Sequence, residues 1–137
     1  MSQLHRIGVS FAAGNAGGLA TVLSLWLFGA IGISAALGVA LAPPLSPGLI
    51  YNMMVWGGIF GFLFLLPMLL GSVVKRGLLY GLAPSAVQCL IVFPMKAGAG
   101  VGGVDLGLMT PILVLVLNSI WGVVTAWLFV QAQGEAG

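Results

Sequence analysis

Charged residues are nearly absent from this sequence, which has only six Asp, Glu, Lys and Arg residues among 137. They make up 4 % of the chain, whereas soluble domains have about 25 %. A domain of this size cannot cover its surface with six charges, and a disordered chain would be polar. Hydrophobic residues make up 61 %. The composition excludes a soluble globular protein and a disordered one, and it predicts one integral membrane domain over residues 1–137.

Metal-ligating and catalytic side chains are also scarce. Cys89 is the only cysteine and His5 the only histidine, so an internal disulfide, a thiolate metal cluster and bis-histidine haem ligation within one chain are excluded. The uncharged stretches contain no titratable pair for acid–base chemistry. The net charge of +2 is too small and scattered to indicate nucleic acid. We therefore expect no catalytic residue, no metal and no cofactor, and hence not an enzyme.

The uncharged stretches locate the membrane spans. Residues 7–74, 77–95 and 106–134 carry no charge, and a spanning helix needs about 20 apolar residues. The first stretch is long enough for two helices, and three prolines within 42–48 interrupt it. We expect four spanning helices, at about 9–31, 48–70, 77–95 and 111–131.

A cleaved signal peptide is an alternative for the first of these spans. Arg6 could be its basic region, and residues 40–42, Ala-Leu-Ala, resemble a cleavage site. Signal peptides run to about 15–30 residues, so cleavage after residue 42 would be late. We favour a retained first helix.

The basic residues predict the orientation in the membrane. Arg6 precedes the first span, and Lys75 and Arg76 lie between the second and third. The other side has Lys96, with Asp105 nearby. Because basic residues gather on the cytoplasmic side, both termini are expected to be cytoplasmic.

The two halves of the chain resemble each other. Three segments recur at offsets of 63 to 65 residues: Gly-Leu-Ala at 18–20 and 81–83, Leu-Ser-Pro and Met-Thr-Pro at 45–47 and 109–111, and Trp-Gly at 56–57 and 121–122. We predict a duplication with repeat one at about 9–72 and repeat two at about 77–131, related as parallel two-helix repeats about the membrane normal. Ser46 and Thr110 each precede a proline, which predicts two hydroxyl N-caps.

A small set of polar and aromatic residues in the spans is the candidate site. An Asn precedes each Trp-Gly pair on the same helix face, as Asn52 before Trp56 and Asn118 before Trp121; Gln88 is the third amide. One hypothesis is that the amides join helices inside the bundle, each Trp N–H finding a partner such as an Asn. The other is a polar path or ligand site.

Glycines at helical spacing predict close helix contacts. Pairs four residues apart form small-xxx-small motifs at Gly14 and Gly18, Gly57 and Gly61, and Gly77 and Gly81. The connectors 33–46 and 97–110 have few charges or none. We expect them to lie at the membrane interface, to dip between helices, or to form a helical extension with a plain turn.

Three stretches resemble a known group. They are Val-Trp-Gly-Gly-Ile-Phe-Gly at 55–61, Arg-Gly-Leu-Leu-Tyr-Gly-Leu at 76–82 and Pro-Ile-Leu-Val-Leu-Val-Leu-Asn-Ser-Ile-Trp-Gly at 111–122. Over about residues 45–128 the chain is similar to small four-span bacterial membrane proteins of unknown function. The resemblance implies this architecture and the bacterial inner membrane, and it implies no activity.

Two functions are compatible with these features. The favoured one is a structural or accessory helical bundle in the lipid bilayer that associates with itself or with another membrane protein. The alternative is a passive channel, permease or small-molecule-binding protein with a polar path near Asn52, Gln88 and Asn118.

Overall fold

Four long helices dominate the computed structural model, which describes residues 2–66 and 71–136, and the side chains up to residue 132. The protein is 82 % helical, and no strand occurs in the described ranges. Four helices are long and apolar enough to cross a membrane: Gln3–Ala30, Pro47–Leu65, Val73–Lys96 and Thr110–Ala132. The predicted all-α fold with four spanning helices is confirmed. The predicted end of the second span, at residue 70, lies outside the described residues.

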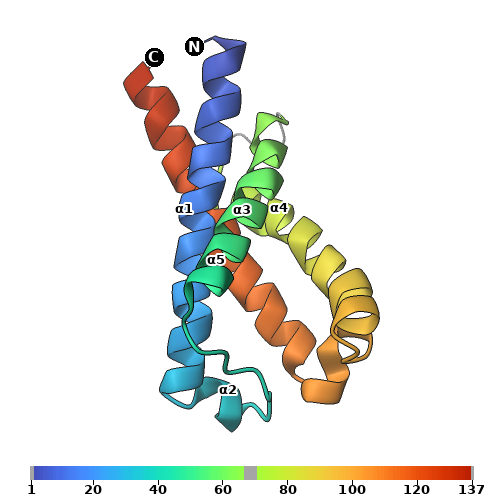
Figure 1. Ribbon diagram of the computed structural model, residues 1–137. Helices are drawn as coiled ribbons and strands as arrows, with labels where there is room; N and C mark the ends of the chain where they lie inside the picture. The colour runs from blue at the N-terminus through green and yellow to red at the C-terminus, as the bar shows by residue number, and fades with distance from the viewer. Residues whose placement is uncertain (1, 67–70, 137) are drawn as a thin grey trace.

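The elements follow one another in a simple order. Helix α1 (Gln3–Ala30) leads through the short α2 (Ile33–Ala36) to α3 (Pro47–Gly61), which continues as the 3₁₀ turn η1 (Phe62–Leu65). Helix α4 (Val73–Val87) continues as the π-helix η2 (Gln88–Lys96), and the 3₁₀ segment η3 (Val101–Leu106) leads into α5 (Thr110–Ala136). The two termini lie at the same end, opposite to α2 (Figure 1).

Hydroxyl side chains begin three of the helices. The Ser46 hydroxyl accepts from Leu49 N at 3.2 Å, with Pro47 in the first turn, as the sequence predicts. Ser2 caps α1, which therefore begins six residues before the predicted boundary at residue 9. Ser72 caps α4.

The predicted N-cap at Thr110 is wrong by one residue. Helix α5 begins at Thr110 itself, and Leu113 N donates to the carbonyl of Met109 at 3.0 Å, so Met109 stands at the cap. The preceding turn positions Thr110, whose N–H donates to Gly107 O. Its buried hydroxyl has no partner within the described residues.

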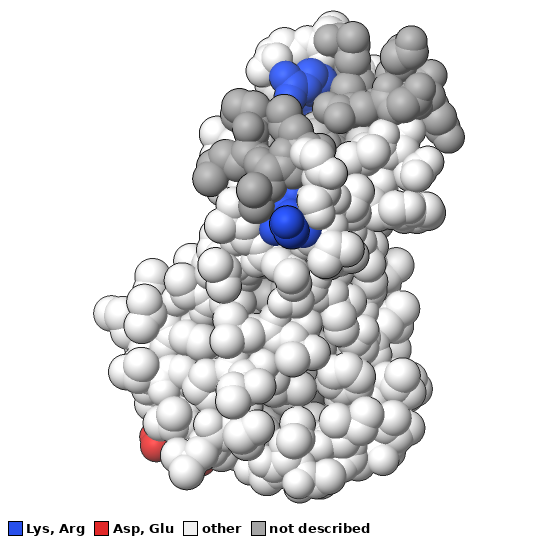
Figure 2. Space-filling model, turned by 180° about the vertical axis from the view of Figure 1, so that it is seen from behind, with Lys and Arg blue, Asp and Glu red and all other residues white. Residues whose placement is uncertain are grey.

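Lys75 and Arg76 lie in the first turn of α4, not in a connector as expected. Lys75 is exposed, whereas Arg76 is only 3 % exposed. On the face that Figure 2 shows, Lys and Arg atoms lie toward the end that holds the termini, acidic atoms lie at the opposite end, and uncharged surface separates them.

Glycines form the closest contacts between helices. A methyl group at Gly14 of α1 would lie 2.9 Å from Gly58 Cα of α3, and one at Gly77 of α4 would lie 2.6 Å from the backbone carbon of Gly122 in α5. Real side chains do not reach such distances. Gly18, Gly57, Gly61 and Gly81 likewise lie against the backbone of a facing helix.

The same contacts occur in both helix pairs. Gly18 lies against the backbone of Met53, and Gly81 lies against the backbone of Asn118. Gly81 follows Gly18 by 63 residues, and Asn118 follows Met53 by 65. The contact of Gly14 with Gly57 recurs, at the same two offsets, as the contact of Gly77 with Gly122. The pattern supports the duplication, which stays a prediction. It matches Asn118 with Met53, not with Asn52.

The connectors 33–46 and 97–110 pack on each other at the end away from the termini. Ala40 N donates to Leu106 O at 2.8 Å, and Gly107, at φ 147°, lies against the carbonyl of Gly38. The first connector contains the short α2, and the second contains η3. The two connectors therefore join the two helix pairs at this end.

Candidate ligand-binding cavity

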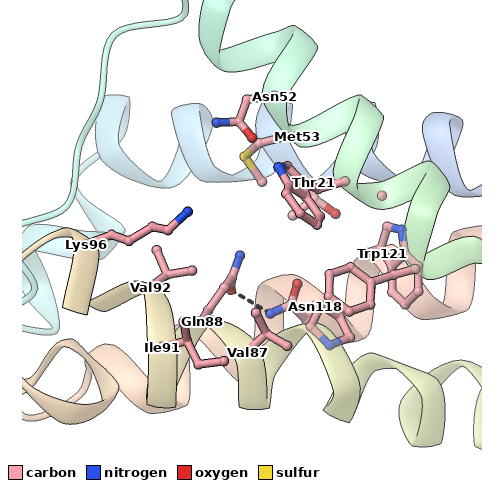
Figure 3. Close-up of a pocket in the computed structure, with 14 residues that line it drawn as sticks. Thr21, Asn52, Met53, Val87, Gln88, Ile91, Val92, Lys96, Asn118 and Trp121 are labelled. Atoms are coloured by element: carbon pink, nitrogen blue, oxygen red, sulfur yellow. Dashed lines mark hydrogen bonds between the residues drawn. The ribbon is translucent and has the colours of Figure 1, made fainter. Parts of the chain in front are cut away.

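A cavity of about 410 Å³ lies between residues of α1 and α3 on one side and residues of α4, η2 and α5 on the other (Figure 3). The lining is Thr21, Asn52, Met53, Trp56, Gly57, Phe60, Pro84, Val87, Gln88, Ile91, Val92, Lys96, Asn118 and Trp121. Most of these side chains are apolar or aromatic, and the polar ones come from both walls. Such a composition is typical of small-molecule sites.

One wall of the cavity carries a hydrogen-bonded amide network. The Asn118 amide donates to Gln88 Oε1 at 2.9 Å and to Ser85 Oγ at 3.1 Å. Ser85 in turn donates to the Gly81 carbonyl at 2.8 Å. Because Gln88 Oε1 accepts this bond, its amide NH₂ projects toward the cavity (Figure 3).

Several polar groups at the cavity have no hydrogen-bond partner among the described residues. They are the amide NH₂ of Gln88, the amide of Asn52 and the ammonium of Lys96. Lys96 extends from the end of η2 toward the space between Asn52 and Gln88 (Figure 3). The Lys96 ammonium and the Gln88 NH₂ are donors, whereas the Asn52 amide both donates and accepts, so donors outnumber acceptors among these three groups.

The π-helix η2 positions this wall. It runs for nine residues from Gln88 to Lys96, with Pro94 inside it. Ala97 N donates to Val92 O at 2.8 Å, a bond across five residues. The π-helix is rare, appears mostly as a single turn and is often found at functional sites. Here it begins at the residue whose amide faces the cavity.

All five residues of the predicted polar cluster line this one cavity. Asn118 is 5 % exposed and lies inside the bundle, whereas Asn52 is exposed on the opposite wall. The amides of Asn52 and Asn118 are not bonded to each other. The prediction that both Asn side chains face the interior therefore holds for Asn118 alone.

The two tryptophans differ in their surroundings. Trp121 is 2 % exposed, and its Nε1 donates to the Gly14 carbonyl at 3.2 Å, so its partner is a backbone group and not an Asn. This bond joins α5 to α1. Trp56 is 53 % exposed and stacks at a tilt on Phe60, 6.4 Å between ring centroids. It forms part of the cavity rim and not a buried contact.

The six predicted packing glycines lie mainly outside the cavity. Gly57 alone belongs to its lining, and the other five lie at the helix crossings described above. Cys89 is not part of the lining. In the part of the chain that the structure describes, no three His, Cys, Asp or Glu side chains come together.

The sequence analysis did not predict the surroundings of two basic side chains. Lys96 was placed at the end of the third predicted span, because a charge usually marks the end of a span. Arg76 was placed between the second and third spans, yet its guanidinium donates to the Phe64 carbonyl and, at 3.2 Å, to Leu66 O. It also faces three aromatic rings at 5.3 to 5.7 Å, those of Phe64, Tyr80 and Phe129. The aromatic residues at 64, 80 and 129 are the sequence feature that could have indicated this contact, because a guanidinium packs on aromatic rings.

The fold and the cavity together define a class: a four-helix membrane protein with a ligand-sized cavity between two helix pairs. Comparisons with family models, with curated proteins and with solved structures give no match to this chain. The resemblance to small four-span bacterial membrane proteins stays a prediction.

Proposed function

We propose that this protein binds a small molecule in the cavity between its two helix pairs. The observation that carries the proposal is the set of unpartnered polar groups of Asn52, Gln88 and Lys96 around one cavity of about 410 Å³. Ligand sites typically have about 300–1,000 Å³, a mainly apolar lining and a few convergent polar groups. This cavity has all three properties.

An accessory bundle, the function favoured from the sequence, accounts for fewer of these features. In such a bundle the buried amides join helices, as Asn118 does with Gln88 and Ser85. It gives no role to Asn52, and it gives Lys96 only that of marking the end of a span, although both exposed side chains line the cavity. The alternative from the sequence was a passive channel, a permease or a small-molecule-binding protein. The last two both need a binding step, which this cavity would provide.

Filling the cavity tests this proposal. Val92 projects into the cavity from η2 (Figure 3), and Val92→Trp adds a bulky ring there. Leu90→Trp is the matched control, because Leu90 lies on the same helix, is 61 % exposed and does not line the cavity. Native mass spectrometry of protein released from mild detergent is expected to show a bound small molecule on the wild type and on Leu90→Trp, and none on Val92→Trp.

Other outcomes of this measurement contradict the proposal. A wild-type protein with no bound molecule, or one that Val92→Trp retains equally, removes the cavity as the site. The same spectra give the number of chains, so a homo-oligomer or a complex with an empty cavity would favour the accessory bundle.

We propose that the chain lies in a bacterial inner membrane with both termini cytoplasmic. The support is the excess of basic residues at Arg6, Lys75 and Arg76 over Lys96 and the resemblance noted above. A reporter fused after residue 137 is expected to be active as a cytoplasmic enzyme and inactive as a periplasmic one. A periplasmic result contradicts this orientation and leaves the cavity proposal unaffected.

A further inference from the structure

We infer that the ligand of this cavity is a single-chain anionic amphiphile, with a carboxylate at Lys96 and an apolar tail along the aromatic residues. This inference rests on the proposed binding function and specifies its ligand class. The positive charge of the lining favours an anionic ligand. Lys96 is the only charged residue of the lining, and no Asp or Glu occurs among the described residues that line the cavity.

The donors in the cavity favour a ligand that accepts hydrogen bonds. The ammonium of Lys96 has three donors, and the free amide NH₂ of Gln88 has two. Asn52 adds a further amide from the facing wall. Because a carboxylate accepts several hydrogen bonds and has no donor when ionised, it matches this surplus of donors. Bonds to an ionised group are also the stronger kind.

The ammonium of Lys96 and the ring of Trp121 lie toward opposite ends of the cavity (Figure 3). Helix α3 runs past it from Asn52 through Trp56 to Phe60, and α4 with η2 runs the opposite way from Pro84 to Lys96. Figure 3 accordingly shows Lys96 and Asn52 toward one end and Trp121 toward the other. Eight residues of helix separate Asn52 from Phe60, a length of about 12 Å. A charged head at the first end and an apolar tail toward the second match this arrangement.

The dimensions of the cavity favour a ligand of medium length. Its volume of about 410 Å³ is toward the lower end of the range of about 300–1,000 Å³ for small-molecule sites. The run of about 12 Å from Asn52 to Phe60 is similar to the length of an extended chain of eight to ten carbons, whereas a phospholipid has two longer acyl chains. These dimensions favour a medium-length single chain over a bilayer lipid.

The test is equilibrium binding to the full chain in lipid nanodiscs, with empty nanodiscs as the background. The probes are radiolabelled decanoate, decyltrimethylammonium, which has the same tail and the opposite charge, and butyrate, which has the same head and a short tail. The variants are Lys96→Met, Val92→Trp and the control Lys75→Met. Lys75 is exposed and not part of the cavity.

The expected result is saturable binding of decanoate at one site per chain. Lys96→Met should weaken it by about tenfold or more, because a hydrogen bond to a charged group is lost. Lys75→Met should leave it unchanged, and the other two probes should bind at least about tenfold more weakly, because they lack the anionic head or the tail.

Failure of the inference and failure of the proposed function give different results. If decanoate and decyltrimethylammonium bind equally and Val92→Trp abolishes both, the cavity is a site but the anionic ligand is wrong. If decanoate does not bind while the wild type still retains another molecule that Val92→Trp loses, the ligand class is again wrong. If Val92→Trp changes neither kind of binding, both the inference and the proposed function are overturned.

Discussion

The substitution Gly122→Ala is expected to destabilise the protein strongly, although alanine is the better helix former. A Cβ at this position would overlap the backbone of Gly77 in α4, 2.7 Å from its carbonyl carbon. Backbone atoms cannot move aside as a flexible side chain can, so α4 and α5 must separate along their contact. Overpacking of this kind costs about 1–3 kcal/mol or more, which exceeds the gain in helix propensity of roughly 1 kcal/mol.

Gly8→Ala is the matched control for Gly122→Ala. Gly8 lies inside α1, and no atom lies within 4 Å of the position that a Cβ would take. The same change there should be neutral or should raise the free energy of unfolding by up to about 1 kcal/mol. Reversible unfolding in mixed detergent micelles measures both variants. An unchanged free energy for Gly122→Ala would show that α4 and α5 do not meet at this glycine.

Arg76→Leu is expected to lower the free energy of unfolding by several kcal/mol. Arg76 donates to the carbonyls of Phe64 and Leu66 at the end of η1. The Leu66 carbonyl would keep the Tyr80 hydroxyl as a donor, at 2.7 Å, whereas among the described residues the Phe64 carbonyl would lose its side-chain donor. A buried carbonyl that loses its donor costs about 1–3 kcal/mol, and the cation–π contacts add up to about 2 kcal/mol when desolvated. Replacing a whole buried ion pair by apolar residues is often harmless, but here the Phe64 carbonyl stays behind.

Arg76→Lys and Lys75→Leu test why Arg76→Leu lowers the free energy of unfolding. Arg76 Nη2 donates to both carbonyls. Lysine keeps the charge but lacks the planar guanidinium that packs on aromatic rings, so Arg76→Lys should recover only part of the lost stability. Lys75 is exposed on the same turn, and surface substitutions usually change stability by less than about 0.5 kcal/mol. If Arg76→Leu behaves like Lys75→Leu, the contacts of Arg76 do not stabilise the fold.

The spans could be predicted because their signal is local. An uncharged stretch of helical length is sufficient to locate a membrane helix, and the proline-rich segment 42–48 separates the first two. The cap at Ser46 is also local, since a hydroxyl before Pro47 specifies a helix start. At Thr110 the same pattern gave a cap one residue too late, because the turn at Gly107 determines where α5 begins.

The arrangement of the polar residues could be predicted only in part. Composition identifies Asn52, Gln88 and Asn118, because an amide in an apolar helix needs a partner or a ligand. The direction in which each amide points depends on which residues face each other across the helix pairs. In the comparison of the two halves, Asn118 corresponds to Met53 and not to Asn52. This difference of one residue turns a side chain by about 100° around a helix. The contact of Gly18 with Met53 reveals the correct match.

The placement of Lys96 and Arg76 depends on irregular helix segments. Lys96 ends a π-helix, in which each turn holds more residues than the period of 3.6 assumes. A helical projection of the sequence therefore does not turn Lys96 toward the cavity. Arg76 is buried because the 3₁₀ turn η1 brings Phe64 and Leu66 to it, and no local pattern predicts that turn.

The most direct test of the cavity as a ligand site is the electron density of the protein crystallised from a lipid phase. We predict an elongated density between α3 and η2, with a polar end within hydrogen-bond distance of Lys96 or of the amide NH₂ of Gln88. The contradictory result is a closed bundle in which Asn52 bonds directly to Gln88 or Asn118, or a cavity that holds only ordered water.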